Sequence, residues 1–179
     1  VPNIPELISF RYNPGSKRTG NAIIGKPIEA KYGVSDQQIM AAYRQAKLQG
    51  VKRFGIHTML ASNELNYEYM VQTSQMLLEL IADISAELDI TFEFINIGGG
   101  LGIPYEPDMR GLDLNAMGRD ITTLFKKFRH QHGYEPALYM ESGRYITGPH
   151  GVLVTKAINR KDIYRTYVGV DASMSSLMR

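Results

Sequence analysis

Apolar residues along this chain alternate between short runs and longer stretches with helical spacing. The short runs are rich in β-branched and aromatic residues, and they cover residues 7–12, 51–58, 91–97 and 136–140. Such runs are typical of buried strands. Between them, apolar positions recur every three to four residues, which predicts helices over 35–50, 71–88 and 113–132. Four strand–helix units with few hairpin signals predict an α/β fold with a parallel sheet, or part of a (β/α)8 barrel.

The ends of two predicted helices carry specific signals. Ser35 with Gln38 forms a capping box, Gly50 closes that helix, and Gly133 ends the last one. The expected core faces of the three helices are Ile39, Ala42, Tyr43 and Ala46; Val71, Ser74, Leu78, Ile81, Ile84 or Ser85, and Leu88; and Leu114, Met117, Ile121, Leu124, Phe125 and Phe128.

After Gly151 the pattern changes. Residues 152–158 and 164–170 read as two strands joined by a charged link, with no helix between them. We therefore expect a barrel-like part over 1–150 and the first strands of a β-rich domain over 151–179. The chain begins without a methionine and ends without a closing signal, so it is expected to be a piece of a longer protein.

Composition narrows the class of protein. With 179 residues, 44% hydrophobic and 21% charged, the chain is expected to be soluble and globular with one ordinary core. No apolar run approaches the roughly 18 residues of a membrane span. A net charge of +2 argues against nucleic acid as a partner. The chain has no cysteine, which excludes disulfides and a thiol nucleophile within it and fits a cytoplasmic protein.

Two strand ends carry candidate chemistry. Gly98, Gly99 and Gly100 follow a buried strand, and backbone N–H groups in such a loop can converge on an anion. The strand over 136–140 runs into Glu141 and Arg144. Because parallel α/β folds place their ligand-binding and catalytic residues at the carboxyl ends of the strands, these features predict a site for a phosphorylated cofactor. A plain flexible turn and a structural Glu141–Arg144 pair are the alternatives.

Other motifs are weaker. The segment 20–26 has the spacing of a P-loop, but Pro27 stands where Ser or Thr should hold magnesium. The glycines at 98–102 do not match the dinucleotide-binding fingerprint. His130 and His132 are expected on the surface rather than in a metal site, and His57 reads as a packed or hydrogen-bonded core histidine.

Several segments together resemble a known family. Glu141-Ser-Gly-Arg144 resembles the Glu-Pro-Gly-Arg signature of the fold-type III, pyridoxal-phosphate-dependent decarboxylases of basic amino acids. The run Phe94–Gly102 resembles that family's phosphate-binding glycine loop. Phe10–Pro14, Lys31–Gly33 and Val170–Met174 resemble further landmarks in the right order, closest to the diaminopimelate decarboxylase branch.

The resemblance implies pyridoxal 5′-phosphate at the carboxyl-end mouth of a barrel. It implies that Glu141 keeps the pyridine nitrogen protonated and that Arg144 engages a substrate carboxylate. The cofactor-binding residues it implies are Ser62, Gly98, Gly99, Gly100, Glu141, Ser142, Gly143, Arg144 and His57. The substrate-binding residues it implies are Arg144, Arg179 and Asp171.

The activity implied is decarboxylation of a diamino acid, most closely meso-diaminopimelate to L-lysine, in a homodimer. Three departures stand against it: Met59 replaces the histidine that stacks on the cofactor ring, Ser142 replaces a proline, and the family's cofactor-bonding lysine and catalytic cysteine fall outside residues 1–179. The alternatives are a non-catalytic homologue that binds cofactor or a protein partner, and a decarboxylase of a polyamine precursor, for which Arg179 would have less use.

Overall fold

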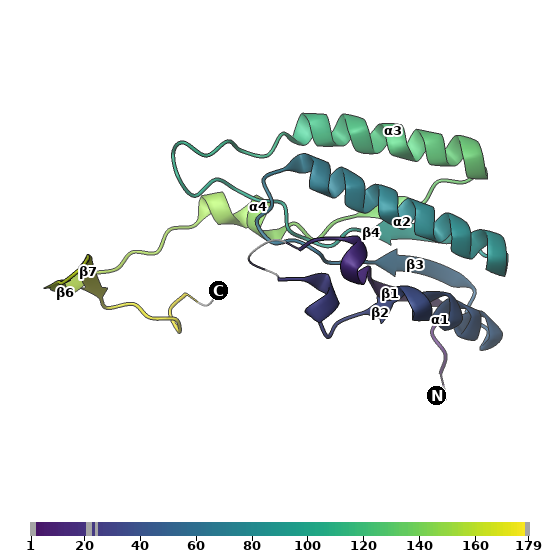
Figure 1. Ribbon diagram of the computed structural model, residues 1–179, viewed down its shortest axis with the longest axis horizontal. Helices are drawn as coiled ribbons and strands as arrows, with labels where there is room; N and C mark the ends of the chain where they lie inside the picture. The colour runs from purple at the N-terminus through teal and green to yellow at the C-terminus, as the bar shows by residue number, and fades with distance from the viewer. Residues whose placement is uncertain (1–2, 21–22, 24, 178–179) are drawn as a thin grey trace. The chain divides into compact units, whose positions relative to one another are not determined.

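The computed structural model describes residues 3–20, 23 and 25–177. The chain divides into two compact units, Val1–Gly148 and Pro149–Arg179, and each is described by itself. The first unit combines strands with three long helices (Figure 1). Its strands are β1 (Leu7–Asn13), β2 (Val34–Ser35), β3 (Arg53–His57), β4 (Phe92–Asn96) and β5 (Ala137–Tyr139). Its α-helices are α1 (Asp36–Leu48), α2 (Tyr67–Leu88), α3 (Leu114–His132) and α4 (Gly143–Thr147), and 3-10 turns lie at Gly15–Lys17 and Pro27–Glu29.

The five strands form one parallel sheet in the order β2-β1-β3-β4-β5. From β1 onward each new long strand is added on the same side, as in consecutive strands of a (β/α)8 barrel, whereas a doubly wound sheet reverses direction. The predicted α/β fold with a parallel sheet is therefore confirmed.

The helices cover one face of this sheet. Phe54 and Phe92 lie side by side in the register of β3 and β4, with their rings tilted against each other. Each ring also makes an edge-to-face contact with Tyr43 of α1. α2 packs against both α1 and α3, and Figure 1 shows α2 and α3 running alongside each other. The residues with no exposed surface at the centre of this core are Tyr43, Ile56, Leu77, Ile81, Ile84 and Ile95.

Alternation along the strands leaves a second set of side chains on the opposite face of the sheet. The register aligns Gly55 with Phe94, and a Cβ on Gly55 would lie 2.2 Å from the Phe94 ring. Phe94 in turn stacks on Tyr139 at a ring-centroid distance of 4.8 Å. Arg11, His57 and Asn96 are also aligned across three neighbouring strands. This face of the sheet therefore carries a row of polar side chains from three neighbouring strands.

The helix predictions succeed at the caps and in most of the core. The Ser35 N–H donates to Gln38 Oε1 at 3.2 Å, and Gly133 ends α3 with φ of +76°. Leu114 was wrongly assigned to the core, because it lies at the first position of α3 and is 38% exposed. Ala42, Val71 and Leu124 are only partly buried, while the buried residues that the pattern missed are Met70, Thr73, Leu77 and Ala116.

The second unit contains an antiparallel hairpin of β6 (Ala157–Asp162) and β7 (Thr166–Val170), after a 3-10 turn at Gly148–His150. The predicted strand over 152–158 is wrong, because the strand begins at Ala157 and includes the charged residues expected to link the two strands. Both faces of β6 and β7 are exposed, so apolar spacing does not fix their register.

Candidate active site

Three neighbouring strands deliver polar side chains to the carboxyl edge of the sheet. His57 ends β3, Asn96 ends β4, and Glu141 follows β5. Asn96 Nδ2 donates to Glu141 Oε1 at 2.9 Å, and His57 Nε2 lies 3.6 Å from the same oxygen. Within the described part of the chain both contacts use Oε1, so Oε2 is open to a donor from a ligand. The arrangement presents a fixed carboxylate at the place where parallel α/β folds bind ligands.

The surroundings of His57 favour its neutral form. Burial lowers the pKa of the imidazole below its usual value, and this effect exceeds the opposing pull of the Glu141 carboxylate; the Arg11 guanidinium lowers the pKa further. Among the described residues, His57 Nε2 and Ser142 Oγ are buried atoms without a hydrogen-bond partner. Buried polar atoms normally have hydrogen-bond partners, so these two atoms are free to form hydrogen bonds with a ligand.

The glycine loop lies directly beside this carboxylate. Gly98 and Gly100 have φ of +73° and +106°, which side chains rarely adopt, and the Gly98 N–H donates to Asn96 Oδ1 at 2.9 Å. A Cβ on Gly99 would lie 2.6 Å from the Glu141 carbonyl oxygen, and one on Gly100 would lie 2.5 Å from that of Ala61. Three glycines are therefore needed because the loop turns sharply between two other loops.

The structure brings the other candidates of the first unit to the same edge. Ser62 is half-buried in the loop after β3, next to the Ala61 carbonyl that Gly100 approaches. Ser142 and Gly143 stand at the start of α4, where the Gly143 N–H donates to the Glu141 carbonyl at 2.9 Å. Arg144 is half-buried, with its guanidinium 5.9 Å from the centre of the Tyr105 ring.

Two substrate candidates belong to other parts of the chain. Asp171 belongs to the second unit, where its Oδ1 accepts from Thr155 Oγ1 at 2.7 Å and from the Lys156 N–H at 2.9 Å. These hydrogen bonds hold the pKa of the Asp171 carboxyl below its usual value. Arg179 lies outside the described residues.

Sequence reasoning missed Asn96 and Arg11 as site residues. Asn96 was signalled only by an amide at the end of a buried strand, two residues before the glycines. Arg11 Nη2 donates to the Met59 carbonyl at 3.2 Å, and the Gly99 N–H donates to Met59 Sδ at 3.1 Å. Met59 thus lies against the glycine loop and links it to β1.

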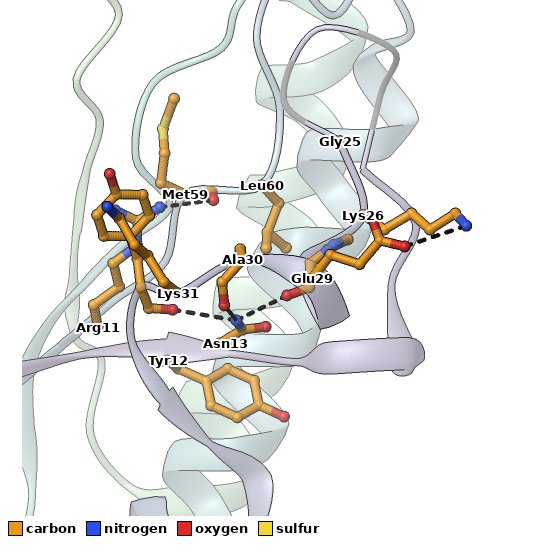
Figure 2. Close-up of a pocket in the computed structure, with 12 residues that line it drawn as sticks. Arg11, Tyr12, Asn13, Gly25, Lys26, Glu29, Ala30, Lys31, Met59 and Leu60 are labelled. Carbon is orange, nitrogen blue, oxygen red and sulfur yellow. Dashed lines mark hydrogen bonds and ion pairs between the residues drawn. The ribbon is translucent and has the colours of Figure 1, made fainter.

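A cavity of about 470 Å³ adjoins this region at the carboxyl end of β1 (Figure 2). Arg11 and Met59 contribute to its lining, as do Asn13, Lys31 and Tyr32. Among the described residues, no three His, Asp or Glu side chains are grouped so that they could hold a metal ion. None of the described helices is long and apolar enough to cross a membrane.

Comparison with known proteins shows a matching family and similar relatives. Residues 3–148 match the family described as "Pyridoxal-dependent decarboxylase, pyridoxal binding domain". The chain is 43% identical over 177 residues to Protein TabA of Pseudomonas amygdali pv. tabaci, covering 98% of this chain and 41% of that protein. It is 35% identical over 175 residues to diaminopimelate decarboxylase of Methanothermobacter thermautotrophicus, covering 96% and 41%.

The fold is shared with solved structures. The crystal structure of diaminopimelate decarboxylase from M. jannaschii in co-complex with L-lysine superposes with a TM-score of 0.77 at 24% identity, over 97% of this chain and 41% of that one. The chain therefore spans about 41% of the length of the relatives that it matches.

Proposed function

We propose that this chain, which belongs to the pyridoxal-dependent decarboxylases, carries the cofactor-binding part of an active site. The reaction that we propose for this active site is the decarboxylation of a diamino dicarboxylic acid. The substrate that we propose is meso-diaminopimelate, with L-lysine as product. Relatives named diaminopimelate decarboxylase support this substrate. Protein TabA, which is more similar in sequence, has a name that specifies no substrate.

The observation that carries the proposal is the Glu141 carboxylate at the carboxyl edge of the sheet. Asn96 fixes one of its oxygens, and the other is open to a ring N–H. Two buried atoms without a hydrogen-bond partner within the described residues, His57 Nε2 and Ser142 Oγ, belong to residues at the carboxyl ends of β3 and β5. A ligand with a protonated heterocycle and further polar groups fits these donors and acceptors, and pyridoxal 5′-phosphate is such a ligand.

Different residues at the carboxyl edge of the sheet would contact different groups of this cofactor. The backbone N–H groups of the loop Gly98–Gly100, with Ser62, would face its phosphate, since glycines allow close approach of an anion. Glu141 would keep the pyridine nitrogen protonated, and the lowered pKa of His57 disfavours a competing positive charge on that side chain. When bound, the cofactor supplies the electron sink that stabilises negative charge left on the substrate after CO2 departs. Arg144 would then orient a substrate carboxylate through its guanidinium fork.

The test is Glu141→Gln in the protein produced from its complete reading frame. The amide keeps the size of the side chain but removes the charge that stabilises a protonated ring, so we expect release of CO2 from meso-diaminopimelate to fall by about 100-fold or more. Glu135→Gln, an exposed position just before β5, is the matched control and should keep the parent rate. Cofactor binding is followed separately by quenching of protein fluorescence.

Three outcomes would change the assignment. Undiminished CO2 release by Glu141→Gln would remove the proposed role of this carboxylate. Cofactor binding without CO2 release by the parent protein would favour the non-catalytic alternative. Release from a diamino monocarboxylic acid, but not from the dicarboxylic one, would favour a decarboxylase of a polyamine precursor.

Three further assignments do not rest on the described geometry. We propose that Arg179 engages the second substrate carboxylate, that Asp171 lies near the substrate, and that the whole protein is a homodimer in the cytoplasm. Arg179→Ala should then raise KM for the dicarboxylic substrate sharply, and an unchanged KM would contradict the role of Arg179.

A further inference from the structure

The loops that follow β3 and β4 are joined beyond the ends of these strands. The Glu64 N–H donates to the Gly100 carbonyl and the Gly102 N–H donates to the Glu64 carbonyl, each at 2.8 Å. These two hydrogen bonds form an isolated parallel bridge between Glu64 and Leu101. The pairing of β3 with β4 therefore resumes after the glycine loop, and the two loops are held together on both sides of it.

Asn63 lies directly before this bridge and has an unusual backbone conformation. Its φ is +53°, and among the described residues other than glycine only Asp89 also has a positive φ. Asp89 is the C-cap of α2, a position where a left-handed residue commonly ends a helix. Asn63 ends no helix. A left-handed residue held in a loop by its surroundings is typical of ligand-binding and active sites.

The side chain of Asn63 adds a third hydrogen bond between the two loops. Its Oδ1 accepts from the Ile103 N–H at 2.9 Å, one residue beyond the Gly102 N–H that the bridge uses. Ile103 is buried, so water cannot readily replace this acceptor. The Asn63 amide therefore fixes the end of the loop after β3 onto the loop after β4.

Ser62 and the glycine loop are brought together by these contacts. Gly100 approaches the loop after β3 so closely that a Cβ on it would lie 2.5 Å from the Ala61 carbonyl oxygen. Ser62 stands between Ala61 and Asn63, so the chain is fixed against the loop after β4 on either side of it. The distance between Ser62 and Gly100, two of the residues proposed to face a phosphate, thus depends on Asn63.

We propose that Asn63 is a positioning residue, which holds Ser62 and the glycine loop at the separation that a phosphate group requires. Donors that already converge bind an anion more tightly than donors that must be ordered when it binds. Asn63 acts through Ser62 and Gly100 and makes no contact with the phosphate itself. The assignment of this phosphate to pyridoxal 5′-phosphate rests on the proposed function.

The test is Asn63→Gly in the protein produced from its complete reading frame. Glycine adopts a positive φ without strain, so this change removes the Oδ1 acceptor and keeps the backbone conformation accessible. We expect the dissociation constant of pyridoxal 5′-phosphate, measured by equilibrium dialysis, to rise about three- to tenfold, as for the loss of one hydrogen bond. The dissociation constant of pyridoxal, which lacks the phosphate, should not change. Asp89→Gly is the matched control, because it makes the same kind of change at the other left-handed residue, and it should alter neither constant.

The outcomes separate this inference from the proposed function. An Asn63→Gly protein with the parent's affinity for pyridoxal 5′-phosphate would overturn the positioning role while the proposed function stands. An equal loss of affinity for pyridoxal, or a variant that does not fold, would also overturn it, because Asn63 would then serve only the stability of the loops.

A parent protein that binds no pyridoxal 5′-phosphate would contradict the proposed function, and calorimetry with inorganic phosphate would then decide the role of Asn63. Weaker phosphate binding by Asn63→Gly than by the parent would support the positioning role. Equal phosphate binding by the two proteins, or none by either, would overturn it.

Discussion

Gly99→Ala tests whether the glycine loop and Glu141 form one rigid arrangement. Gly99 lacks the positive φ of its two neighbours, so alanine can adopt its backbone conformation and the cost falls on one contact. The added Cβ would lie 2.6 Å from the Glu141 carbonyl oxygen. The glycine loop and Glu141 cannot move apart freely, because the Glu141 N–H donates to the Gly98 carbonyl and the Glu141 carbonyl accepts from the Gly143 N–H, each at 2.9 Å.

The magnitude follows from this distance. Relieving the contact requires a displacement of about 0.8 Å, from 2.6 Å to the 3.4 Å of an ordinary contact. Forcing a methyl group into a packed region costs about 1–3 kcal/mol of unfolding free energy. A displacement approaching 1 Å at a catalytic group costs about 100-fold in rate. We therefore expect Gly99→Ala to lose both stability and cofactor affinity.

Urea unfolding and fluorescence titration with pyridoxal phosphate measure the two effects on the same protein. Gly118→Ala is the matched control, because Gly118 is an exposed helical position in α3 with no atom within 4 Å of the added Cβ. It should raise stability by about 0.5–1 kcal/mol and leave cofactor affinity unchanged. A Gly99→Ala protein with the parent's stability and cofactor affinity would refute the close approach of the loop to Glu141.

Two more predictions concern the sheet. Tyr43→Phe removes a buried hydroxyl that donates to the Gly55 carbonyl at 2.6 Å, so it should lower the unfolding free energy by about 1–3 kcal/mol in urea denaturation, and no loss would contradict this. Burial lowers the pKa of His57 in the folded protein, so the unfolded chain binds a proton at His57 more readily. The contribution of His57 to the unfolding free energy is therefore complete above about pH 6.5 and declines as the pH falls below that value. His57→Gln should flatten the fall in melting temperature on acidification, whereas equal slopes would contradict the shift.

The parallel sheet could be predicted because each of its four longer strands carries a local signal, whereas the two-residue strand β2 carries none. The run before Gly98 and the run before Glu141 are bounded by turn residues, and the Ser35 capping box marks where α1 begins. The hairpin β6–β7 could not be placed equally well. Its side chains are exposed on both faces, so a shift of strand register changes little buried surface and leaves no trace in the apolar pattern.

The same distinction holds within the site. The glycine loop and Glu141 are visible in the sequence because each follows a strand directly. Arg11 is not, because its proximity to His57 depends on the register between β1 and β3. The register of β3 with β4 also shifts between Phe54 and Gly55, and this shift determines which residue of β4 meets His57. Contacts of this kind depend on how distant segments align, which apolar spacing does not encode.

Asn96 shows why the loop and the carboxylate cannot be adjusted separately. Its Oδ1 accepts the Gly98 N–H while its Nδ2 donates to Glu141 Oε1, both at 2.9 Å. An aspartate could make the first contact but would oppose Glu141 with a like charge, and a leucine could make neither. Only an amide of this length satisfies a donor and an acceptor at once. One side chain therefore positions both the loop proposed to hold the phosphate and the carboxylate proposed to hold the ring, which fixes the distance between them.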